Sequence, residues 1–277
     1  MANIRLFEKL SHVDSYVKFR PTYPADLYHR ILSFLSKKKP PPHGMAVDVG
    51  CGSGQSTHGI APSFQRVIGF DISKAQIEAA AKASTVSNVE FKVSPADSLP
   101  VEACSVDLVT CAQAVHWLDF KSFCEESRRI LRPRGCLAVY GYGVPWLDHQ
   151  KPAIKKLLAK DFDELYFDAL GSYWNERRRH IENKYADFSL PFEESERDDS
   201  LEIRVEWSLA HFIGYLRSWS AYQLCLEKDP TKETLLPEYQ KKVLAALGDP
   251  EASPNDTMLQ IVSPIFLLLG RKPDDTA

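Results

Sequence analysis

The sequence predicts an α/β fold in which a mostly parallel sheet is covered by helices on both faces. Five strand-like apolar runs alternate with helical patterns between residues 45 and 140. Three glycines alternate directly after the first run, and an aspartate ends the second. Strands that alternate with helices form a doubly wound parallel sheet. Such sheets bind ligands beyond the carboxyl ends of their strands, so we expect a small-molecule site at that edge.

Each element of this sheet has its own local signal. The strands are expected at residues 45–49, 66–71, 88–93, 106–111 and 136–140. The helices between them are expected at residues 55–61, 74–83 and 120–131. Ser73 and Gln76 form a capping box at the start of the second helix, and Asp119 caps the third.

The chain is expected to form one domain with four segments. Residues 1–43 would form lid helices around an elbow at Pro21 and Pro24, and residues 44–141 the ligand-binding core. Residues 142–200 would insert a helical cap that ends in an acidic, solvated loop at 193–199. Residues 201–277 would supply helices and the strands that complete the sheet. Pro264 in the last strand indicates a break or an edge position, because proline cannot donate to a sheet ladder.

The composition is that of an ordinary globular protein and argues against several functions. Of the 277 residues, 44% are hydrophobic and 26% are charged. The formal net charge of −3 and the isoelectric point near 6.3 argue against a broad nucleic-acid-binding surface. Neither a signal peptide nor a membrane-spanning run is expected. Six cysteines without C-x-x-C pairs or metal-ligand spacing indicate reduced thiols, no metal site and a cytoplasmic location.

The glycine loop follows the pattern Asp48-x-Gly50-x-Gly52-x-Gly54. Glycine allows positive φ and lets a ligand approach the main chain closely. A dinucleotide-binding loop needs a small residue where this chain has Gln55, so the spacing disfavours a dinucleotide-dependent dehydrogenase. Asp71, at the end of the second strand, is placed to accept hydrogen bonds from a ribose diol.

These residues resemble the class I S-adenosylmethionine (SAM) dependent methyltransferases, and within them the trans-aconitate methyltransferase-like group. The class signature comprises Asp48-x-Gly50-x-Gly52-x-Gly54, Asp71, Ala96-Asp97 and Leu131-Arg132-Pro133-x-Gly135. The narrower likeness comprises Tyr16-x-x-x-Arg20-Pro21-x-Tyr23-Pro24, His116-Trp117-Leu118-Asp119-Phe120, Tyr173-Trp174 and Arg217-Ser218-Trp219-Ser220-Ala221-Tyr222. Arg134 departs from the class, which usually has glycine there. The resemblance implies a Rossmann-like fold with a seven-stranded, mostly parallel sheet and a helical cap insertion.

The resemblance also implies SAM as the cofactor and a set of residues that bind it. Asp71 would hold both ribose hydroxyls, Asp97 would accept from the adenine amino group, and Ile72 would lie against the adenine ring. The glycines would pack against the methionine part, and residues 113–116 would line the methyl-donor side. The complete set is Asp48, Gly50, Cys51, Gly52, Gly54, Asp71, Ile72, Ala96, Asp97, Gln113 and Ala114.

The expected methyl acceptor is a small molecule that carries a carboxylate, methylated on oxygen by in-line transfer. Arginine binds a carboxylate bidentately, and Arg20 and Arg217 lie within the family-like motifs, so we favour them over residues 177–179. An aromatic lid is expected to enclose this acceptor. The lid candidates are Tyr16, Tyr23, Tyr140, Tyr142, Trp146, Tyr173, Trp174 and Trp219, and the competing interpretation is that they are core residues. Trp117 is also expected to contact the acceptor.

Two alternatives stay open at the level of the sequence. His116 is the one attractive general base, and it would be needed for a neutral, amine or thiol acceptor. The competing interpretation is that His116 is a packed, hydrogen-bonded structural residue beside Trp117. The intact glycine loop argues only for binding, so a non-catalytic SAM-binding regulator is also compatible with the sequence.

Overall fold

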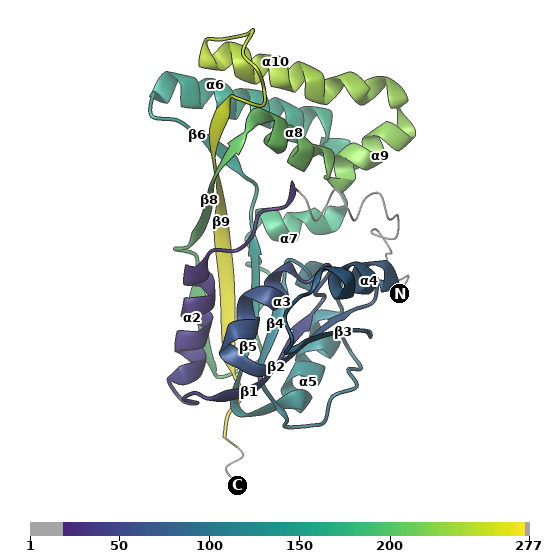
Figure 1. Cartoon of the computed structure of the whole chain (residues 1–277), viewed down its shortest axis with the longest axis vertical. Helices are drawn as coiled ribbons and strands as arrows, with labels where there is room; N and C mark the ends of the chain where they lie inside the picture. The colour runs from purple at the N-terminus through teal and green to yellow at the C-terminus, as the bar shows by residue number, and fades with distance from the viewer. Residues whose placement is uncertain (1–18, 275–277) are drawn as a thin grey trace.

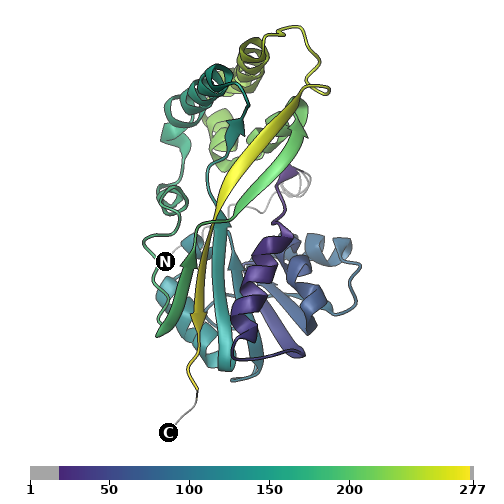
Figure 2. The same ribbon diagram turned by 90° about the vertical axis from the view of Figure 1, so that its left-hand side faces the viewer.

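The structure, a computed structural model that describes residues 19–274, has two parts joined by one long strand. The lower part in Figure 1 is a sheet flanked by helices, and the upper part is a layer of helices on an extension of that sheet. Strand β9 (Met258–Arg271) runs through both parts, as the turned view in Figure 2 shows. Within residues 19–274, no helix is long and apolar enough to cross a membrane. Tyr16 lies outside the described residues.

The main sheet has the strand order β3-β2-β1-β4-β5-β9, and β7 pairs with the far side of β9. Strands β1 to β5 are parallel, whereas β9 is antiparallel to both β5 and β7. The bounds are β1 His43–Val49, β2 Phe64–Asp71, β3 Val89–Val93, β4 Val106–Ala112, β5 Leu131–Tyr142 and β7 Glu194–Asp198. The predicted fold, a mostly parallel sheet covered by helices, is thereby confirmed, and with its antiparallel extension the sheet has nine strands.

Apolar residues of the central strands alternate between the two faces of the sheet, as strand geometry requires. In β5, for example, Leu137 and Val139 belong to one apolar cluster, and Ala138 and Tyr140 to the other. Helices α2 and α3 cover the second face, α5 covers the first, and α4 contacts β2 and β3. The bounds are α2 Ala25–Ser36, α3 Gln55–Ile60, α4 Lys74–Ala83 and α5 Phe120–Ile130.

Helix α2 lies in the stretch that was expected to form lid helices, but it packs into the core. Its apolar residues Leu27, Ile31 and Leu35 recur at helical spacing and are fully buried against the sheet. The buried Arg271 of β9 donates to the main-chain carbonyls of Phe34 and Leu35 at the end of α2. This helix is therefore a layer of the core, and a lid can lie only outside it.

The upper part is built from two separate stretches of sequence. The first half of β9 lies between β6 and β8, which form an antiparallel extension of the sheet. One face of this extension packs against helices from both stretches. The bounds are β6 Trp146–Asp148, β8 Glu202–Ser208, α6 Pro152–Asp163, α8 Leu209–Arg217, α9 Ser220–Lys228 and α10 Leu235–Leu247. The helical layer therefore includes residues of the expected cap, 142–200, and also helices from residues 201–277.

Shorter helices connect these elements. Helix α6 continues into a π-helix at Glu164–Ala169, and α7 spans Arg179–Glu182. Single 3₁₀ turns occur at Ala61–Ser63, Val115–Trp117, Gly171–Tyr173, Glu176–Arg178 and Pro230–Thr234. In Figure 1, α7 lies between the lower and upper parts.

Two local expectations are also corrected. The acidic stretch expected as a solvated loop forms the edge strand β7, whose Asp198 and Glu196 pair with Arg30 and Lys37 of the α2 segment. Basic residues from α2 neutralise these charges, which allows the acidic strand to lie at the sheet edge. Pro264 neither breaks β9 nor lies at an edge. It lies where the neighbour of β9 changes from β5 to β6, so its missing N–H interrupts no ladder.

Candidate active site

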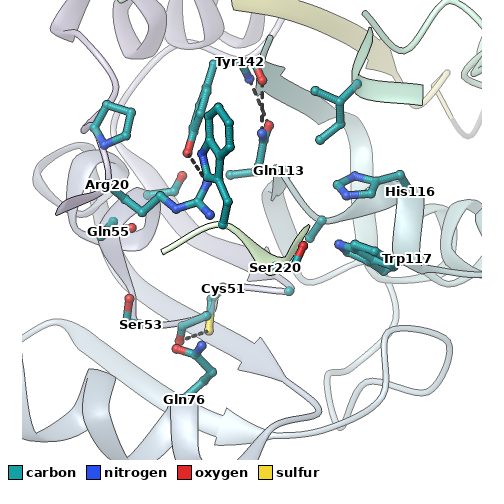
Figure 3. A pocket seen from close by; sticks show the side chains of 18 of the residues that line it. Arg20, Cys51, Ser53, Gln55, Gln76, Gln113, His116, Trp117, Tyr142 and Ser220 are labelled. Carbon is teal, nitrogen blue, oxygen red and sulfur yellow. Dashed lines mark hydrogen bonds between the residues drawn. The ribbon is translucent and has the colours of Figure 1, made fainter. Parts of the chain in front are cut away.

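A pocket of about 170 Å³ opens beyond the carboxyl ends of β1, β4 and β5, at the junction of the two parts. Its lining combines the glycine loop, the ends of β4 and β5, the segment before α2, residues 174–181 and the start of α9. Figure 3 shows Arg20, Tyr142 and Gln113 on one side of it and Cys51, Ser53 and Gln76 on the other. The pocket thus lies at the edge of the sheet predicted from the sequence.

The glycine loop presents main chain to this pocket. Gly50, Gly52 and Gly54 have φ of +67°, +53° and +85°, which only glycine adopts without strain. The N–H groups of Gly50 and Cys51 both donate to the carbonyl of Phe70, which anchors the loop on β2. A Cβ on Gly50 would lie 2.6 Å from the Cβ of Ala114, whereas a Cβ on Gly52 would meet nothing closer than 3.9 Å. Gly52 therefore faces open space in the pocket.

Asp48, which was expected among the cofactor-binding residues, has both carboxylate oxygens bonded within the protein. Its two carboxylate oxygens accept from the hydroxyls of Thr57 and Thr110, each at 2.7 Å. Burial raises the pKa of Asp48 to about 6, and the two hydroxyl donors oppose that rise. Asp48 is not among the described residues that line the pocket. It joins β1 to α3 and β4 and so fixes the position of the loop.

Asp71 holds the glycine loop to the start of α4. Its carboxylate accepts from the main-chain N–H groups of Gly52 (2.9 Å) and Ser73 (2.8 Å). Burial is the main cause of a raised pKa at Asp71, and these backbone donors oppose it. Ile72 follows with 47% of its surface exposed, and Asp97 is exposed after the neighbouring strand β3. Asp71, Ile72, Ala96 and Asp97 therefore lie along the sheet edge, outside the described pocket lining.

Ser53 and Gln76 are among the pocket residues that the sequence analysis did not assign to the site. The Ser53 hydroxyl and the Gln76 Oε1 atom are buried, line the pocket and have no hydrogen-bond partner among the described residues. Gln76 was interpreted only as half of a capping box. Ser73 does accept from the Gln76 N–H at 3.4 Å, but the Ser73 N–H donates to Asp71. The Gln76 side chain is therefore left to face the pocket.

Gln113 lines the pocket with its side chain committed to the protein. It adopts φ of +53°, and its amide donates to the carbonyl of Tyr142 (3.0 Å) and accepts from the Tyr142 N–H (2.9 Å). Gln113 and its neighbour Ala114 were expected to contact the cofactor. Both line the pocket, and the amide of Gln113 also fixes the end of β5, from which the Tyr142 ring projects.

Two arginines from distant parts of the chain meet at this pocket. The Arg20 guanidinium donates to the Tyr142 hydroxyl at 3.3 Å and lies 5.3 Å from the ring centroid of Tyr215. The Arg178 guanidinium lies 4.8 Å from the ring centroid of Trp174, also in the lining. Both cations therefore lie over aromatic rings, an arrangement that favours a guanidinium.

The other expected acceptor residues divide into two groups. Tyr23, Trp117, Tyr142, Trp174 and Trp219 line the pocket as expected. Arg217 is exposed at the end of α8. The described lining includes none of Arg217, Trp146 and Tyr173. Trp146 lies in β6, and Tyr173 lies under the Lys228 ammonium in the helical layer. Arg178 of residues 177–179 lines the pocket and Arg217 does not, so the geometry favours Arg178 where the sequence favoured Arg217.

His116 is almost completely buried, with 5% of its surface exposed. Its Nδ1 atom lies 2.7 Å from the Tyr185 hydroxyl, and Arg177 donates to its main-chain carbonyl. Burial, followed by the charges of Arg178, His180 and Arg177, lowers the pKa of His116 to about 3. The imidazole is therefore neutral at physiological pH and is a weak base, although it lines the pocket.

A search of residues 19–274 finds no group of three or more histidine, cysteine, aspartate or glutamate side chains that could hold a metal ion. The polar groups that converge on the pocket are thus main chain, hydroxyl, amide, imidazole and guanidinium. These groups suit the recognition of an organic ligand with polar and anionic parts.

Comparisons with known proteins agree on one family. A family model described as a methyltransferase domain matches residues 47–139. The chain is 33% identical over 259 residues to a candidate methyltransferase of Dictyostelium discoideum, covering 93% of this chain and 92% of that protein. It is 26% identical over 244 residues to a candidate S-adenosylmethionine-dependent methyltransferase of Saccharomyces cerevisiae, covering 78% and 81%.

A solved structure supports the same relationship. The structure of a candidate type II methyltransferase from Anaeromyxobacter dehalogenans is 32% identical in sequence and matches with a TM-score of 0.74. The match covers 92% of this chain and 99% of that one. The likeness therefore extends over both the sheet and the helical layer above it.

Proposed function

We propose that this chain, which belongs to the S-adenosylmethionine-dependent methyltransferases, methylates a carboxylate oxygen of a small anionic acceptor. The observation that carries the proposal is the pair of guanidinium groups, Arg20 and Arg178, in the lining of one small pocket. Arginine is the side chain best matched to a carboxylate, because its planar fork of N–H donors binds both oxygens.

The chain's own residues fit the cofactor. The open space at Gly52 allows a ligand to approach the main chain, and the buried Ser53 hydroxyl and Gln76 Oε1 need partners that the described protein does not supply. When bound, S-adenosylmethionine supplies a methyl group activated by a positively charged sulfur. A pocket of about 170 Å³ is smaller than sites that enclose a whole drug-sized ligand. We therefore assign the adenosine part to the open edge at Asp71, Ile72 and Asp97.

The protein contributes to catalysis mainly by positioning. Arg20 and Arg178 would hold the acceptor so that one carboxylate oxygen points toward the methyl group, and Trp117, Trp174 and Trp219 would exclude water. A carboxylate is already ionised at neutral pH, so no general base is required. The lowered pKa of His116 supports this mechanism, because so weak a base would activate a protonated acceptor poorly.

The narrower assignment to the trans-aconitate methyltransferase-like group is part of this proposal. It is supported by the motif around Arg20, Pro21 and Tyr23, all three of which line the pocket. A malonyl-[acyl-carrier protein] O-methyltransferase of Hahella chejuensis is 40% identical over 95 residues, or 33% of this chain and 34% of that protein. So short a stretch cannot include both Arg20 and Arg178, so this likeness bears on cofactor binding more than on the acceptor.

A screen with methyl-labelled S-adenosylmethionine tests the proposal. The acceptors are small mono-, di- and tricarboxylates, with amines and thiols of similar size beside them. We expect label to enter a carboxylate and to be released as methanol by mild alkali, because esters hydrolyse where N-methyl and S-methyl groups persist. Alkali-stable label would contradict carboxylate methylation and favour the acceptor classes that need a base. S-adenosylmethionine binding without label transfer to any acceptor would favour a regulator.

Substitution of the arginines supplies the matched comparison. Arg20→Ala and Arg178→Ala should each raise the acceptor KM by about 10- to 100-fold, since a charge-assisted hydrogen bond contributes about 1.5–3 kcal/mol. Arg217→Ala removes an arginine of the same upper part that lies outside the pocket, so it should leave the acceptor KM unchanged. S-adenosylmethionine affinity, measured by calorimetry, should stay within a few-fold in all three. An effect of Arg217→Ala equal to that of Arg178→Ala would contradict the assignment.

A further inference from the structure

We propose that Tyr166, together with Glu182, is a positioning residue that orients Arg178 toward the acceptor. This inference rests on the proposed function of Arg178 and adds a second set of residues to it. Tyr166 is fully buried and is absent from the described pocket lining. It therefore acts through Arg178, whose guanidinium does reach the pocket.

A continuous chain of hydrogen bonds carries the inference. The Arg178 Nε–H donates to the Tyr166 hydroxyl at 2.8 Å, and the Tyr166 hydroxyl donates to Glu182 Oε1 at 2.7 Å. The directions are determined, because a guanidinium can only donate and an ionised carboxylate can only accept. Burial raises the pKa of Tyr166, so its proton stays available for Glu182. Both ends of the chain are ionised, which makes its bonds stronger than neutral ones.

The π-helix at Glu164–Ala169 gives Tyr166 a second interaction at the site, through its main-chain carbonyl. At its end, the Leu170 N–H donates to the carbonyl of Leu165, five residues earlier, and so does not take the carbonyl of Tyr166. That carbonyl accepts from the Trp174 Nε1–H at 3.2 Å instead. Trp174 is the ring over which the Arg178 guanidinium lies. Short π-helical turns of this kind occur frequently at functional sites.

Tyr166 thus fixes Arg178 both through its hydroxyl and through the ring beneath the guanidinium. The Tyr166 hydroxyl accepts only from the Nε–H group of Arg178. No described residue accepts a hydrogen bond from the two terminal nitrogens of Arg178. These nitrogens carry the parallel donors that bind a carboxylate bidentately. A long, flexible arginine loses rotamer entropy when it binds a ligand, and ordering it beforehand removes part of that cost. The expected consequence is tighter acceptor binding without a change at the reacting atoms.

Tyr166→Phe tests the inference because it removes the hydroxyl and keeps the ring. Tricarballylate, a small tricarboxylate from the acceptor panel, is titrated by calorimetry into enzyme saturated with S-adenosylhomocysteine. We expect its dissociation constant to rise about tenfold in Tyr166→Phe and about threefold in Glu182→Gln, with S-adenosylhomocysteine affinity unchanged. Tyr239→Phe is the matched control, since Tyr239 is another buried tyrosine of the helical layer, outside the pocket. It should bind tricarballylate as the wild type does.

A double-mutant cycle separates positioning from general structural support. In an Arg178→Ala background, Tyr166→Phe should cause no further loss of tricarballylate affinity, because its effect passes through Arg178. A second readout needs no acceptor: the Arg178 Nε–H proton, followed by NMR, should exchange with solvent several-fold faster in Tyr166→Phe. A loss of affinity that persists in the Arg178→Ala background, or an unchanged Nε–H exchange rate, would overturn the inference.

The outcome also distinguishes this inference from the proposed function. If Arg178→Ala weakens tricarballylate binding and Tyr166→Phe does not, the positioning role is wrong and the function stands. If the wild type binds no carboxylate of the panel, or Arg178→Ala has no effect, the function itself is contradicted.

Discussion

The substitution Gly52→Ala separates ligand binding from folding at the glycine loop. Gly52 has φ of +53°, and a Cβ built on it would meet only Gln76 Oε1, at 3.9 Å. The folded protein therefore has room for the added methyl group. The cost to stability is the cost of a left-handed backbone for alanine, about 1–2 kcal/mol.

The cost to binding is larger, because the new methyl group would occupy the space assigned to the cofactor. An extra methyl group in a close-packed contact costs about 1–3 kcal/mol, so the dissociation constant of S-adenosylmethionine should rise roughly 10- to 100-fold. Gly50→Ala would not separate the two effects, since its Cβ would also clash with Ala114 at 2.6 Å.

Gly248→Ala is the matched control for Gly52→Ala. Gly248 ends α10 with φ of +88°, and its Cβ would meet no described atom within 4 Å. Urea denaturation should show a similar loss of stability in both variants, and calorimetry should show lost S-adenosylmethionine affinity only in Gly52→Ala. Wild-type affinity in Gly52→Ala would refute the assignment of this loop to the cofactor. Equal loss of affinity in both variants would show that the effect comes from stability alone.

Two further predictions concern stability. In the folded protein the pKa of His116 is lowered to about 3, whereas in the unfolded chain His116 has its ordinary pKa of 6.5. Between these two pH values the unfolded chain binds a proton at His116 that the folded protein does not bind. Stability should therefore fall as pH drops from 6.5 toward 3, and urea denaturation should show a shallower fall for His116→Asn; an identical slope would contradict this. Ile31→Ala should destabilise the protein by about 2–5 kcal/mol, because Ile31 is fully buried in α2. A loss below 1 kcal/mol would restore the lid interpretation of that helix.

Much of the lower part of the fold could be predicted from local signals. The helix at Lys74–Ala83 has the bounds that its periodicity and cap indicate. The expected strands of the core are confirmed. They could be predicted because a buried parallel strand is a continuous apolar run, and few other elements of secondary structure require such a run. Strand β7 was missed since four of its five residues are charged, and only their pairing with β9 and α2 makes them a strand.

The candidate site was predicted unevenly for a similar reason. The glycine loop carries its signal in consecutive residues, so its conformation and its place at the pocket could be read directly. The choice between Arg217 and Arg178 could not be made from the sequence, because both arginines have aromatic residues nearby in the chain. Which arginine reaches the pocket depends on the direction in which its side chain leaves the backbone, and Arg217 at the end of α8 is exposed to solvent.

The sequence by itself determined the doubly wound sheet, the positive-φ loop after its first strand and the family to which those features belong. Each depends on short-range chemistry: glycine conformation, apolar periodicity and capping residues. The tertiary structure alone decided that Asp48 supports the loop, that Gln76 faces the pocket, and that Arg20 and Arg178, 158 positions apart, line the same pocket. These facts depend on how distant segments pack, because the partner that a buried polar group finds is set by the fold and not by its neighbours in the chain.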